Sequence, residues 1–470
     1  MTSIEDRIMA GLPPAPAEKD PEQTGHYEAT ELGNARRLVD DHGHDLRYVA
    51  EWGKWLVWTG RCWQVDNTGA VHRRAKQIAD RILDEARAGS DDKLFRWGIK
   101  SQSNAGINNT IALASTEATI PVLVDELDTD PWLLTVANGT IDLRTGLLGP
   151  HRRQDLLTKS TDVIYDEHAT CPQFLKFLEA VLPDATVLRF LQRAIGYSLT
   201  GTVLEHALFF GYGAGANGKS TLMRVLLDMA GEHGAPAPPR LLIADRHPDH
   251  PTSVAALHGR RVVIAQELDQ ASRLDEPTVK EITGGDRLTA RYMRQDFWSF
   301  APTHKVWLCA NHKPAIRGTD LGIWRRIKLI PFTVSIAPDD QDEHLAEHLA
   351  DELPGILRWA IAGCLEWQRR GLDTPEAVVK ATEQYRLEQD VIGQFIADCC
   401  TTNPMLKVQS TPLYEAYKAW CVEQGITHPL SQKALAPRIE EHGYIGEPDR
   451  KERTWWQGLG LRTEESKNMP

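Results

Sequence analysis

Cysteine is scarce in this sequence, which has seven among 470 residues, at positions 62, 171, 309, 364, 399, 400 and 421. No two of them form a C-x-x-C pair and none stands in a ligand-like group with histidine, which argues against a structural zinc site and a disulfide framework. Long apolar runs are also missing, because no stretch approaches the roughly 18 residues that cross a bilayer. The amino terminus carries no signal-peptide core. We therefore expect a globular protein of the cytoplasm that does not associate with membranes.

An excess of positive charge is missing as well. The chain has 53 Lys and Arg against 65 Asp and Glu, a net charge of −12. Any contact with nucleic acid must therefore come from local basic patches. The length and the 41% content of hydrophobic residues are sufficient for two to four domains with cores of their own.

The segment FFGYGAGANGKSTL, at 209–222, fits the spacing G-x-x-x-x-G-K-[ST]. An apolar run precedes it and a helical pattern follows it, so we expect a strand, a loop and a helix. Glycines let the backbone wrap around phosphate oxygens, and the helix N-terminus favours negative charge. A glycine-rich segment that only turns the chain lacks the lysine and serine found here. The candidate phosphate-binding residues are Gly213, Ala214, Gly215, Ala216, Asn217, Gly218, Lys219, Ser220 and Thr221.

These residues predict that the chain binds ATP with Mg²⁺. Lys219 is placed to reach the β- and γ-phosphates, and the Ser220 hydroxyl suits Mg²⁺. A second buried strand is expected at 262–265, and Glu267 follows it as the candidate to polarise an attacking water. Many phosphate-loop ATPases have an aspartate just before this glutamate, whereas Gln266 stands here, which leaves part of the metal ligation open.

Further polar residues follow the loop in an order that suits an ATP-driven machine. Residues 287–300 read as a hairpin with three arginines, and the buried strand 305–310 ends at Asn311, where a γ-phosphate or water can be sensed. Two adjacent arginines before the strand 327–330 can stabilise phosphoryl-transfer charge across a subunit boundary. Alternatively, the arginines form solvated surface and Asn311 caps a turn. The arginines concerned are Arg287, Arg291 and Arg294 in the hairpin, and Arg325 and Arg326 in the pair.

Composition divides the chain into four parts. Residues 1–28 are expected to be a flexible leader, 29–169 a small α+β domain, 170–372 the ATPase domain with a helical lid, and 373–465 a carboxyl-terminal domain. Four tryptophans at 52, 55, 58 and 63 invite a base-stacking role, but aromatic strands are more often core.

The carboxyl-terminal domain reads as two helices and a hairpin with a basic tip at Arg450, Lys451 and Arg453. This pattern suggests a winged helix, and the family that the chain resembles, named next, favours DNA binding by it. A small helical packing or dimerisation domain is the alternative.

Several segments together resemble a known family. GAGANGKST, VVIAQE, TGGDRLTAR, the strand ending in CANHKP, and GTDLGIWRRIKLIPF are similar to the helicase module of phage and plasmid primase-helicases of superfamily 3. NGTIDLRTG and LGNARRLV extend the similarity over most of 30–335. The resemblance implies an α/β fold: an AAA+-like phosphate-loop core, a small N-terminal α+β domain and a C-terminal winged-helix-like domain. It also implies a ring homohexamer that hydrolyses ATP between subunits while a hairpin grips single-stranded DNA.

The same resemblance assigns roles to matching positions: phosphate and Mg²⁺ binding to Lys219 and Ser220, catalysis to Glu267, sensing to Asn311, the trans-acting arginine to Arg326 in preference to Arg325, and pore contacts to Arg291 and Arg294. Larger relatives carry a primase domain with paired carboxylates on a strand. Only about 170 residues precede the module here, and no apolar strand carries such a pair. We therefore expect no priming by this chain, and a separate primase or other replication proteins as partners.

The expected function is an ATP-dependent helicase of phage, prophage or plasmid replication that acts on single-stranded and forked DNA. Two other classes stay open. A small-molecule kinase would share the phosphate loop but not the arginine hairpin, the asparagine and the arginine pair together. An origin-binding initiator would share every motif and lack strand displacement.

Overall fold

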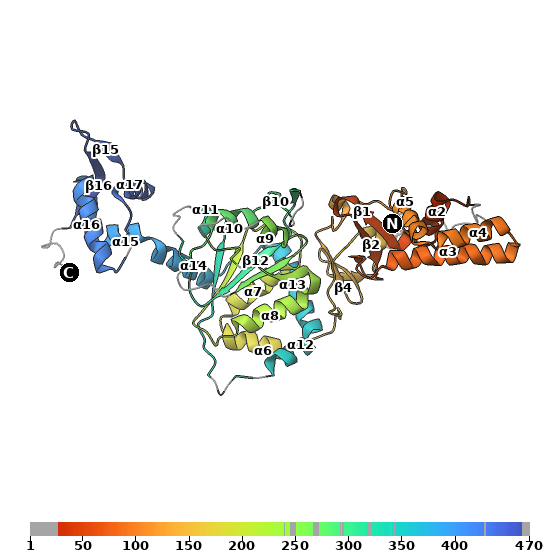
Figure 1. Cartoon of the computed structure of the whole chain (residues 1–470). Coiled ribbons are helices and arrows are strands. Elements are labelled where there is room, and N and C mark those ends of the chain that lie inside the picture. Colours follow the sequence, from red (N-terminus) through yellow and green to blue (C-terminus); the bar gives the residue numbers. More distant parts are fainter. Residues whose placement is uncertain are drawn as a thin grey trace, which may run out of the picture. The chain divides into compact units, whose positions relative to one another are not determined.

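The structure is a computed structural model that describes residues 27–238, 240–244, 251–266, 272–291, 293, 296–316, 321–337, 339, 341–342, 344–426 and 429–462. All but the last two residues of the expected leader lie outside these ranges. The chain divides into two compact units, one up to residue 127 except for 60–62, and the other made of 60–62 and everything from 128 onward. Figure 1 shows both units.

The first unit is a three-stranded antiparallel sheet with helices, as expected for an α+β domain. Thr30 caps the amino end of the first helix, because its hydroxyl accepts a hydrogen bond from the Gly33 amide. Trp63 is fully buried, whereas the other three tryptophans are half-buried. The elements are α2 (Glu31–His42), β1 (Leu46–Val49), β2 (Lys54–Trp58), β3 (Trp63–Val65), α3 (Ala70–Gly89), α4 (Asp92–Ser101) and α5 (Asn104–Ala114).

The second unit is built on a five-stranded parallel sheet, so the chain has the expected α/β class. Its order is β13-β7-β12-β9-β8, and every neighbouring pair is parallel. The strands are β7 (Leu208–Tyr212), β8 (Gly234–Pro236), β9 (Val262–Gln266), β12 (Lys305–Ala310) and β13 (Ile327–Pro331). The helices and the remaining short strands are α6 (Pro172–Val181), α7 (Ala185–Ser198), α8 (Lys219–Ala230), α9 (Pro251–Ala255), α10 (Glu276–Ile282), β10 (Leu288–Ala290), β11 (Trp298–Phe300), α11 (Leu321–Trp324), α12 (Leu345–Asp351), α13 (Leu353–Arg370) and α14 (Glu376–Gln389).

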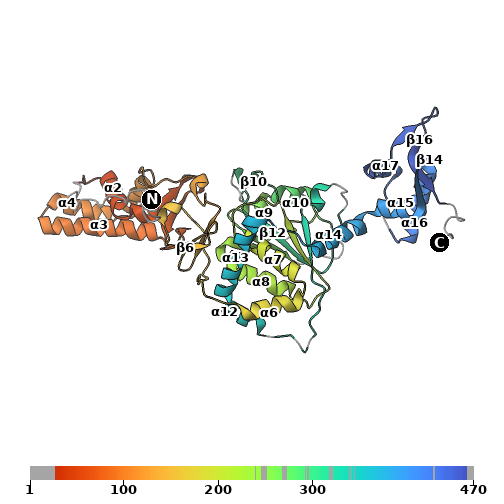
Figure 2. The same ribbon diagram turned by 180° about the vertical axis from the view of Figure 1, so that it is seen from behind.

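Both faces of this sheet are covered, which explains the continuous apolar runs of its strands. Alternate residues point to opposite faces: Phe209 and Trp307 stack on each other in the cluster with α6, α7, α8 and α13. Phe210 and Leu308 face the other cluster, which holds residues of α9, α10, α11 and α14. Figure 2 shows α8 and α10 on opposite sides of the strands.

Helices α7 and α13 approach each other closely at two glycines. A Cβ atom on Gly196 would lie 2.1 Å from the Cys364 amide nitrogen, and one on Gly363 would lie 2.1 Å from the Gln192 carbonyl oxygen. Helix α13, which lies in the segment expected to form a helical lid, thus packs closely on α7.

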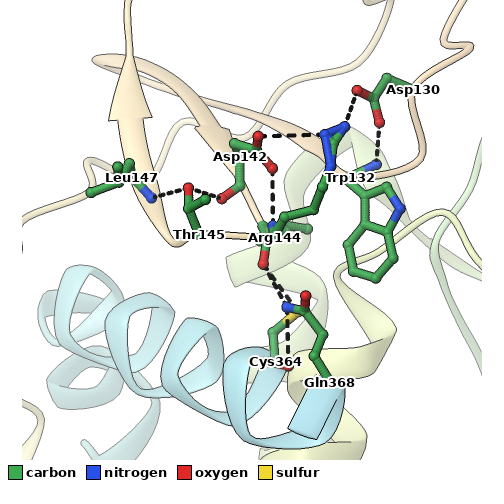
Figure 3. Close-up of polar contacts among 9 residues, drawn as sticks. Asp130, Trp132, Asp142, Arg144, Thr145, Leu147, Cys364 and Gln368 are labelled. Carbon is green, nitrogen blue, oxygen red and sulfur yellow. Dashed lines mark hydrogen bonds and ion pairs between the residues drawn. The ribbon is translucent and has the colours of Figure 1, made fainter. Parts of the chain in front are cut away.

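A small antiparallel sheet, β4 (Leu133–Val136), β5 (Gly139–Asp142) and β6 (Leu147–Gly149), packs on the same helix. The Gln368 amide of α13 donates to the Leu143 carbonyl oxygen at 2.8 Å. On the turn between β5 and β6, Arg144 makes ion pairs with Asp142 and with Asp130, which precedes β4. Figure 3 shows this turn lying against α13.

The domain boundary expected near residue 170 therefore falls at 127 in the structure. Arg261, next to β9, donates to the Leu133 carbonyl oxygen at 2.7 Å, and the Thr161 hydroxyl donates to the Met229 carbonyl oxygen at 2.9 Å. Side-chain bonds to backbone oxygens thus join residues 128–169 to the sheet.

Two buried cations stabilise the carboxyl end of α7. Arg261 donates to the Leu199 carbonyl oxygen at 2.7 Å, and the Lys305 ammonium donates to the carbonyl oxygens of Thr200 and Thr202. Burial lowers the pKa of Arg261 to about 10, and burial, followed by the charge of Arg261, lowers the pKa of Lys305. Cations suit this position because the last carbonyls of a helix carry partial negative charge.

The carboxyl-terminal part has its own cluster, which begins at Ile392. Helix α14 precedes it and packs on the core instead, because the Tyr385 hydroxyl donates to the Pro314 carbonyl oxygen and its ring is fully buried. The elements are α15 (Val391–Cys399), β14 (Cys400–Gln409), α16 (Ser410–Glu423), α17 (Gln432–Glu441), β15 (Gly446–Pro448) and β16 (Thr454–Leu461), and the strand order is β14-β16-β15.

No helix within the described ranges combines the length and the apolar character needed to cross a bilayer.

The close contact of α7 and α13 makes a prediction about stability. Gly196→Ala should destabilise the fold by about 1–3 kcal/mol, because the added methyl has no room in this packing. Gly89→Ala is the matched control, since a Cβ there meets nothing within 4 Å, and it should leave the melting temperature unchanged or raise it. Thermal unfolding followed by circular dichroism measures both. Equal melting temperatures for the two variants would contradict the proposed close contact.

Candidate functional site

The phosphate-binding motif lies where β7 ends and α8 begins, at the carboxyl edge of the sheet. Strand β7 stands between β13 and β12, and its loop opens at the carboxyl end of the strand. Ligands of open α/β sheets bind at this kind of position.

The loop has a backbone that wraps inward. Gly215, Ala216 and Gly218 have φ values of 106°, 48° and 75°. The amide N–H groups from Ala214 to Gly218 make no hydrogen bond to another residue in the described part of the chain. Helix α8 begins at Lys219, so its unpaired amides lie beside those of the loop. This arrangement suits an anion such as phosphate.

Lys219 is folded back onto the loop. Its ammonium donates to the Gly213 carbonyl oxygen at 2.7 Å and to the Asn217 side-chain oxygen at 2.8 Å. Burial lowers the pKa of the Lys219 ammonium. The cation is therefore held at the loop by neutral acceptors, where an anionic ligand would gain from it.

The segment after β13 clasps the loop from one side. Phe332 donates its amide to the Tyr212 carbonyl oxygen at 2.8 Å, and Ile336 donates to the Ala216 carbonyl oxygen at 2.7 Å. Gly213 is needed at this contact, because a Cβ there would lie 2.2 Å from the Phe332 carbonyl oxygen.

Ser220 is exposed at the start of α8, near the thiol of Cys309 on β12. Burial raises the pKa of that thiol, while the charge of Lys219 and the Ser220 hydroxyl oppose the shift. The serine thus lies at the loop, where the sequence predicts a Mg²⁺ ligand.

The neighbouring strands bring two more predicted positions to this edge. Cys309 pairs with Gln266, and Ala310 pairs with Tyr212. The exposed Asn311 therefore follows β12 at the level where the loop leaves β7. Glu267, the predicted catalytic acid, lies outside the described residues.

The arginine pair lies at the opposite edge. The Arg326 carbonyl oxygen accepts from the amide of Leu208, the first residue of β7. The Arg326 guanidinium donates to the Thr283 hydroxyl at 3.2 Å and to the Gly322 carbonyl oxygen at 2.8 Å. Arg325 is exposed. The structure does not bring either arginine to the loop of its own chain.

The predicted arginine hairpin is confirmed as a local structure. Strands β10 and β11 pair antiparallel from Leu288 opposite Phe300. Arg287 donates to the Ser299 carbonyl oxygen at the hairpin base. Arg291 lies 4.8 Å from the centre of the Phe297 ring, and this ring is 59% exposed. Arg294 lies outside the described residues.

The basic hairpin of the carboxyl-terminal part is confirmed too, as β15 and β16 pair antiparallel. Arg450 and Lys451 are exposed at its tip. Arg453, the third basic residue predicted at this tip, makes a 2.7 Å ion pair with Asp449. Hydrogen bonds from Arg453 hold the pKa of the Asp449 carboxyl well below its usual range.

Sequence reasoning missed one contact and one residue at the site. Asn217 was assigned only as part of the loop, although its side chain joins Lys219 to the Phe332 carbonyl oxygen. Lys313 lies over the Tyr212 ring at 4.8 Å and was not singled out. The only signal for either was its place inside a motif.

Three family models match successive segments of the chain. "D5 N terminal like" matches residues 35–183, a family of unknown function (DUF5906) matches 211–326, and "Poxvirus D5 protein-like" matches 387–456.

Curated viral proteins are similar over much of the chain. "Putative helicase L207/L206" of Acanthamoeba polyphaga mimivirus is 27% identical over 68% of this chain and 36% of its own length. "Putative helicase 022R" of Frog virus 3 is 22% identical over 72% and 44%, and "Putative primase C962R" of African swine fever virus is 23% identical over 68% and 37%. The chain thus spans less than half the length of these relatives. The solved C-terminal region of NrS-1 aligns with a TM-score of 0.49 at 10% identity, over 92% of this chain and all of that one.

Two of the three matching models are named for D5 proteins, and the similar viral proteins are named as putative helicases or primases. The chain belongs to the phage and viral primase-helicase family of the D5 type.

Proposed function

We propose that this chain is an ATP-dependent DNA helicase of phage, viral or plasmid replication that works as a ring of identical subunits. One observation carries the proposal: the phosphate-binding loop and the arginine pair stand at opposite ends of the same two strands. Relatives named as helicases support it.

The loop fits a nucleoside triphosphate with Mg²⁺. Its unpaired amides and the start of α8 suit the phosphate oxygens, and the Lys219 ammonium reaches the β- and γ-phosphates after leaving its present acceptors. The Ser220 hydroxyl would hold Mg²⁺, which offsets negative charge on the phosphates. Asn311 stands where it can hold the attacking water or the γ-phosphate, and Glu267 follows β9 as the candidate to polarise that water.

The arginine pair can serve only the site of a neighbouring subunit. From the level of Arg326 to the loop, β7 rises about 16 Å, which is farther than an arginine side chain extends. Beside Arg325 lies a hollow of about 500 Å³, lined in part by Leu321, which is 63% exposed. An exposed apolar surface next to an arginine is typical of a subunit interface. Arg325 is the freer of the two to reach across, since Arg326 is bonded within its own chain.

The arginine hairpin is proposed to contact single-stranded DNA. An exposed aromatic ring with a guanidinium over it offers a face for bases and a charge for phosphates. The carboxyl-terminal part, with its three helices, three-stranded sheet and basic hairpin, is proposed to be a winged helix that holds duplex DNA through Arg450 and Lys451.

An origin-binding initiator without unwinding is the second candidate, because it would use the same loop, arginines and winged helix. Strand displacement on a forked duplex, measured with ATP and Mg²⁺, separates the two. Helicase activity is supported by displacement that stops without ATP. ATP turnover and DNA binding without displacement would favour the initiator. ATP turnover that ignores DNA would favour the kinase alternative.

Mixing variants tests the split site. Lys219→Ala should abolish ATP hydrolysis, because the transferred phosphoryl group loses its positioned cation. The double variant Arg325→Ala/Arg326→Ala should bind ATP and lose turnover. A mixture of the two proteins should recover part of the wild-type rate, since some interfaces pair an intact loop with intact arginines.

Steady-state ATPase assays measure this recovery, with each variant alone as its control. No recovery in mixtures shown by cross-linking to contain both proteins would contradict the split site. Single substitutions at Arg325 and Arg326 then show which arginine acts.

The hairpin makes a separate prediction. Arg291→Ala/Phe297→Ala should weaken binding of single-stranded DNA and remove the acceleration of ATP hydrolysis by DNA, because both stacking and phosphate contacts are lost. Stacking is worth about 1–3 kcal/mol per base, so a loss of roughly tenfold in affinity is expected. Arg87→Ala, an exposed arginine of α3, is the matched control. Fluorescence anisotropy with labelled oligonucleotide measures the affinity. Wild-type affinity in the hairpin variant would refute the assignment.

A further inference from the structure

The Asn217 side chain connects Lys219, at the end of the phosphate-binding loop, to Phe332, in the segment after β13. It is 3% exposed. Its Nδ2 donates to the Phe332 carbonyl oxygen at 3.2 Å, and its Oδ1 accepts from the Lys219 ammonium at 2.8 Å. The amide has only one orientation that fits, because the ammonium can only donate and the carbonyl can only accept.

This geometry places Asn217 in competition with a bound phosphate. Without ligand the Lys219 ammonium is held by the Gly213 carbonyl oxygen and by Asn217. Both acceptors are neutral and belong to the loop, so the lysine is kept in the loop and can be drawn away by a phosphate carrying negative charge.

The other half of the amide holds the loop in place. Among the described residues, Nδ2 is the one side-chain donor that joins the loop to the segment after β13, and the other bonds are those of the Phe332 and Ile336 backbone amides. The described residues offer no second side chain that bridges these two segments and also contacts Lys219.

We propose that Asn217 is a positioning residue: it keeps Lys219 in the empty loop by a bond weak enough to yield, and it ties that loop to Phe332, so it sets how tightly a nucleoside triphosphate binds. The inference rests on the proposed function and adds a residue that controls the same site.

Three substitutions separate this role from simple packing. Asn217→Asp keeps the shape, turns the acceptor into a carboxylate that retains Lys219, and loses the donor to Phe332. Asn217→Leu keeps a similar shape without polar atoms, and Asn217→Ala removes the side chain. If Asn217 acted only through packing, the Asp and Leu variants would bind nucleotide more tightly than the Ala variant. The proposed role predicts that Asp is the most damaging, because a charge-assisted bond is roughly twice as strong as a neutral one.

Equilibrium binding of a fluorescent ATP analogue with Mg²⁺ to the full chain is the test. We expect affinity to fall about tenfold or more for Asn217→Asp, and by a smaller, similar factor for Asn217→Ala and Asn217→Leu. In steady state the KM of Asn217→Asp should rise by a larger factor than kcat falls, since the empty state is what is stabilised. Asn403→Asp, at an exposed position of β14, makes the same charge change away from the loop and should bind like wild type.

The outcomes are distinct. Failure of the wild-type chain to bind the analogue would refute the proposed function itself. If the wild-type chain binds the analogue and either Asn217→Asp or Asn217→Leu binds it more tightly than Asn217→Ala, only the role of Asn217 is overturned. If Asn217→Asp does not fold by its melting curve, the Leu variant decides: wild-type affinity overturns the inference, and an affinity as low as that of Asn217→Ala supports it.

Discussion

The pairing of β13 with β7 is the constraint on which the site depends. These parallel strands are hydrogen-bonded along their full lengths. The Leu208 amide donates to the Arg326 carbonyl oxygen at one end, and the Phe332 amide donates to the Tyr212 carbonyl oxygen at the other. Because the strands are parallel, whatever precedes β13 lies at the amino edge and whatever follows it lies at the carboxyl edge. The arginine pair and the clasp on the loop are thus two ends of one rigid element. In the proposed ring, the residues before β13 would face the ATP site of the neighbouring subunit, and the residues after β13 would contact the loop of their own subunit.

The amino edge of the sheet is held by charge. Arg261 and Lys305 are both buried, and a buried cation is costly unless its hydrogens are satisfied. Here the acceptors are carbonyl oxygens of the residues that follow α7 and of the first strand of the small sheet. Removing either acceptor group would leave some hydrogens of a buried cation without a partner, so α7, the small sheet and the central strands are stabilised together. This explains why residues 128–169 belong to the core.

The sequence predicted those parts that leave a pattern of their own. Buried strands read as apolar runs, and the loop reads as a spaced motif, so β7, β9, β12, β13 and their loop were expected correctly. Contacts to backbone oxygens leave no such pattern, which is why the attachment of the small sheet was missed. The same holds for α13, whose place against α7 depends on Gly196 and Gly363. The bond from Asn217 to the Phe332 carbonyl oxygen could not be predicted either, because the two residues are more than a hundred positions apart in the sequence.

The two proposed DNA elements differ in chemistry, and the difference bears on how such a protein would hold a fork. The hairpin tip combines a guanidinium with the exposed Phe297 ring, so part of its contact would be stacking, which salt weakens little. The basic hairpin of the carboxyl-terminal part offers mainly charge, and the ion pair of Arg453 with Asp449 reduces even that. Contacts made by phosphate neutralisation alone weaken steeply with salt. If the proposed function holds, the carboxyl-terminal part would release and rebind duplex DNA easily, while the hairpin would keep hold of the single strand.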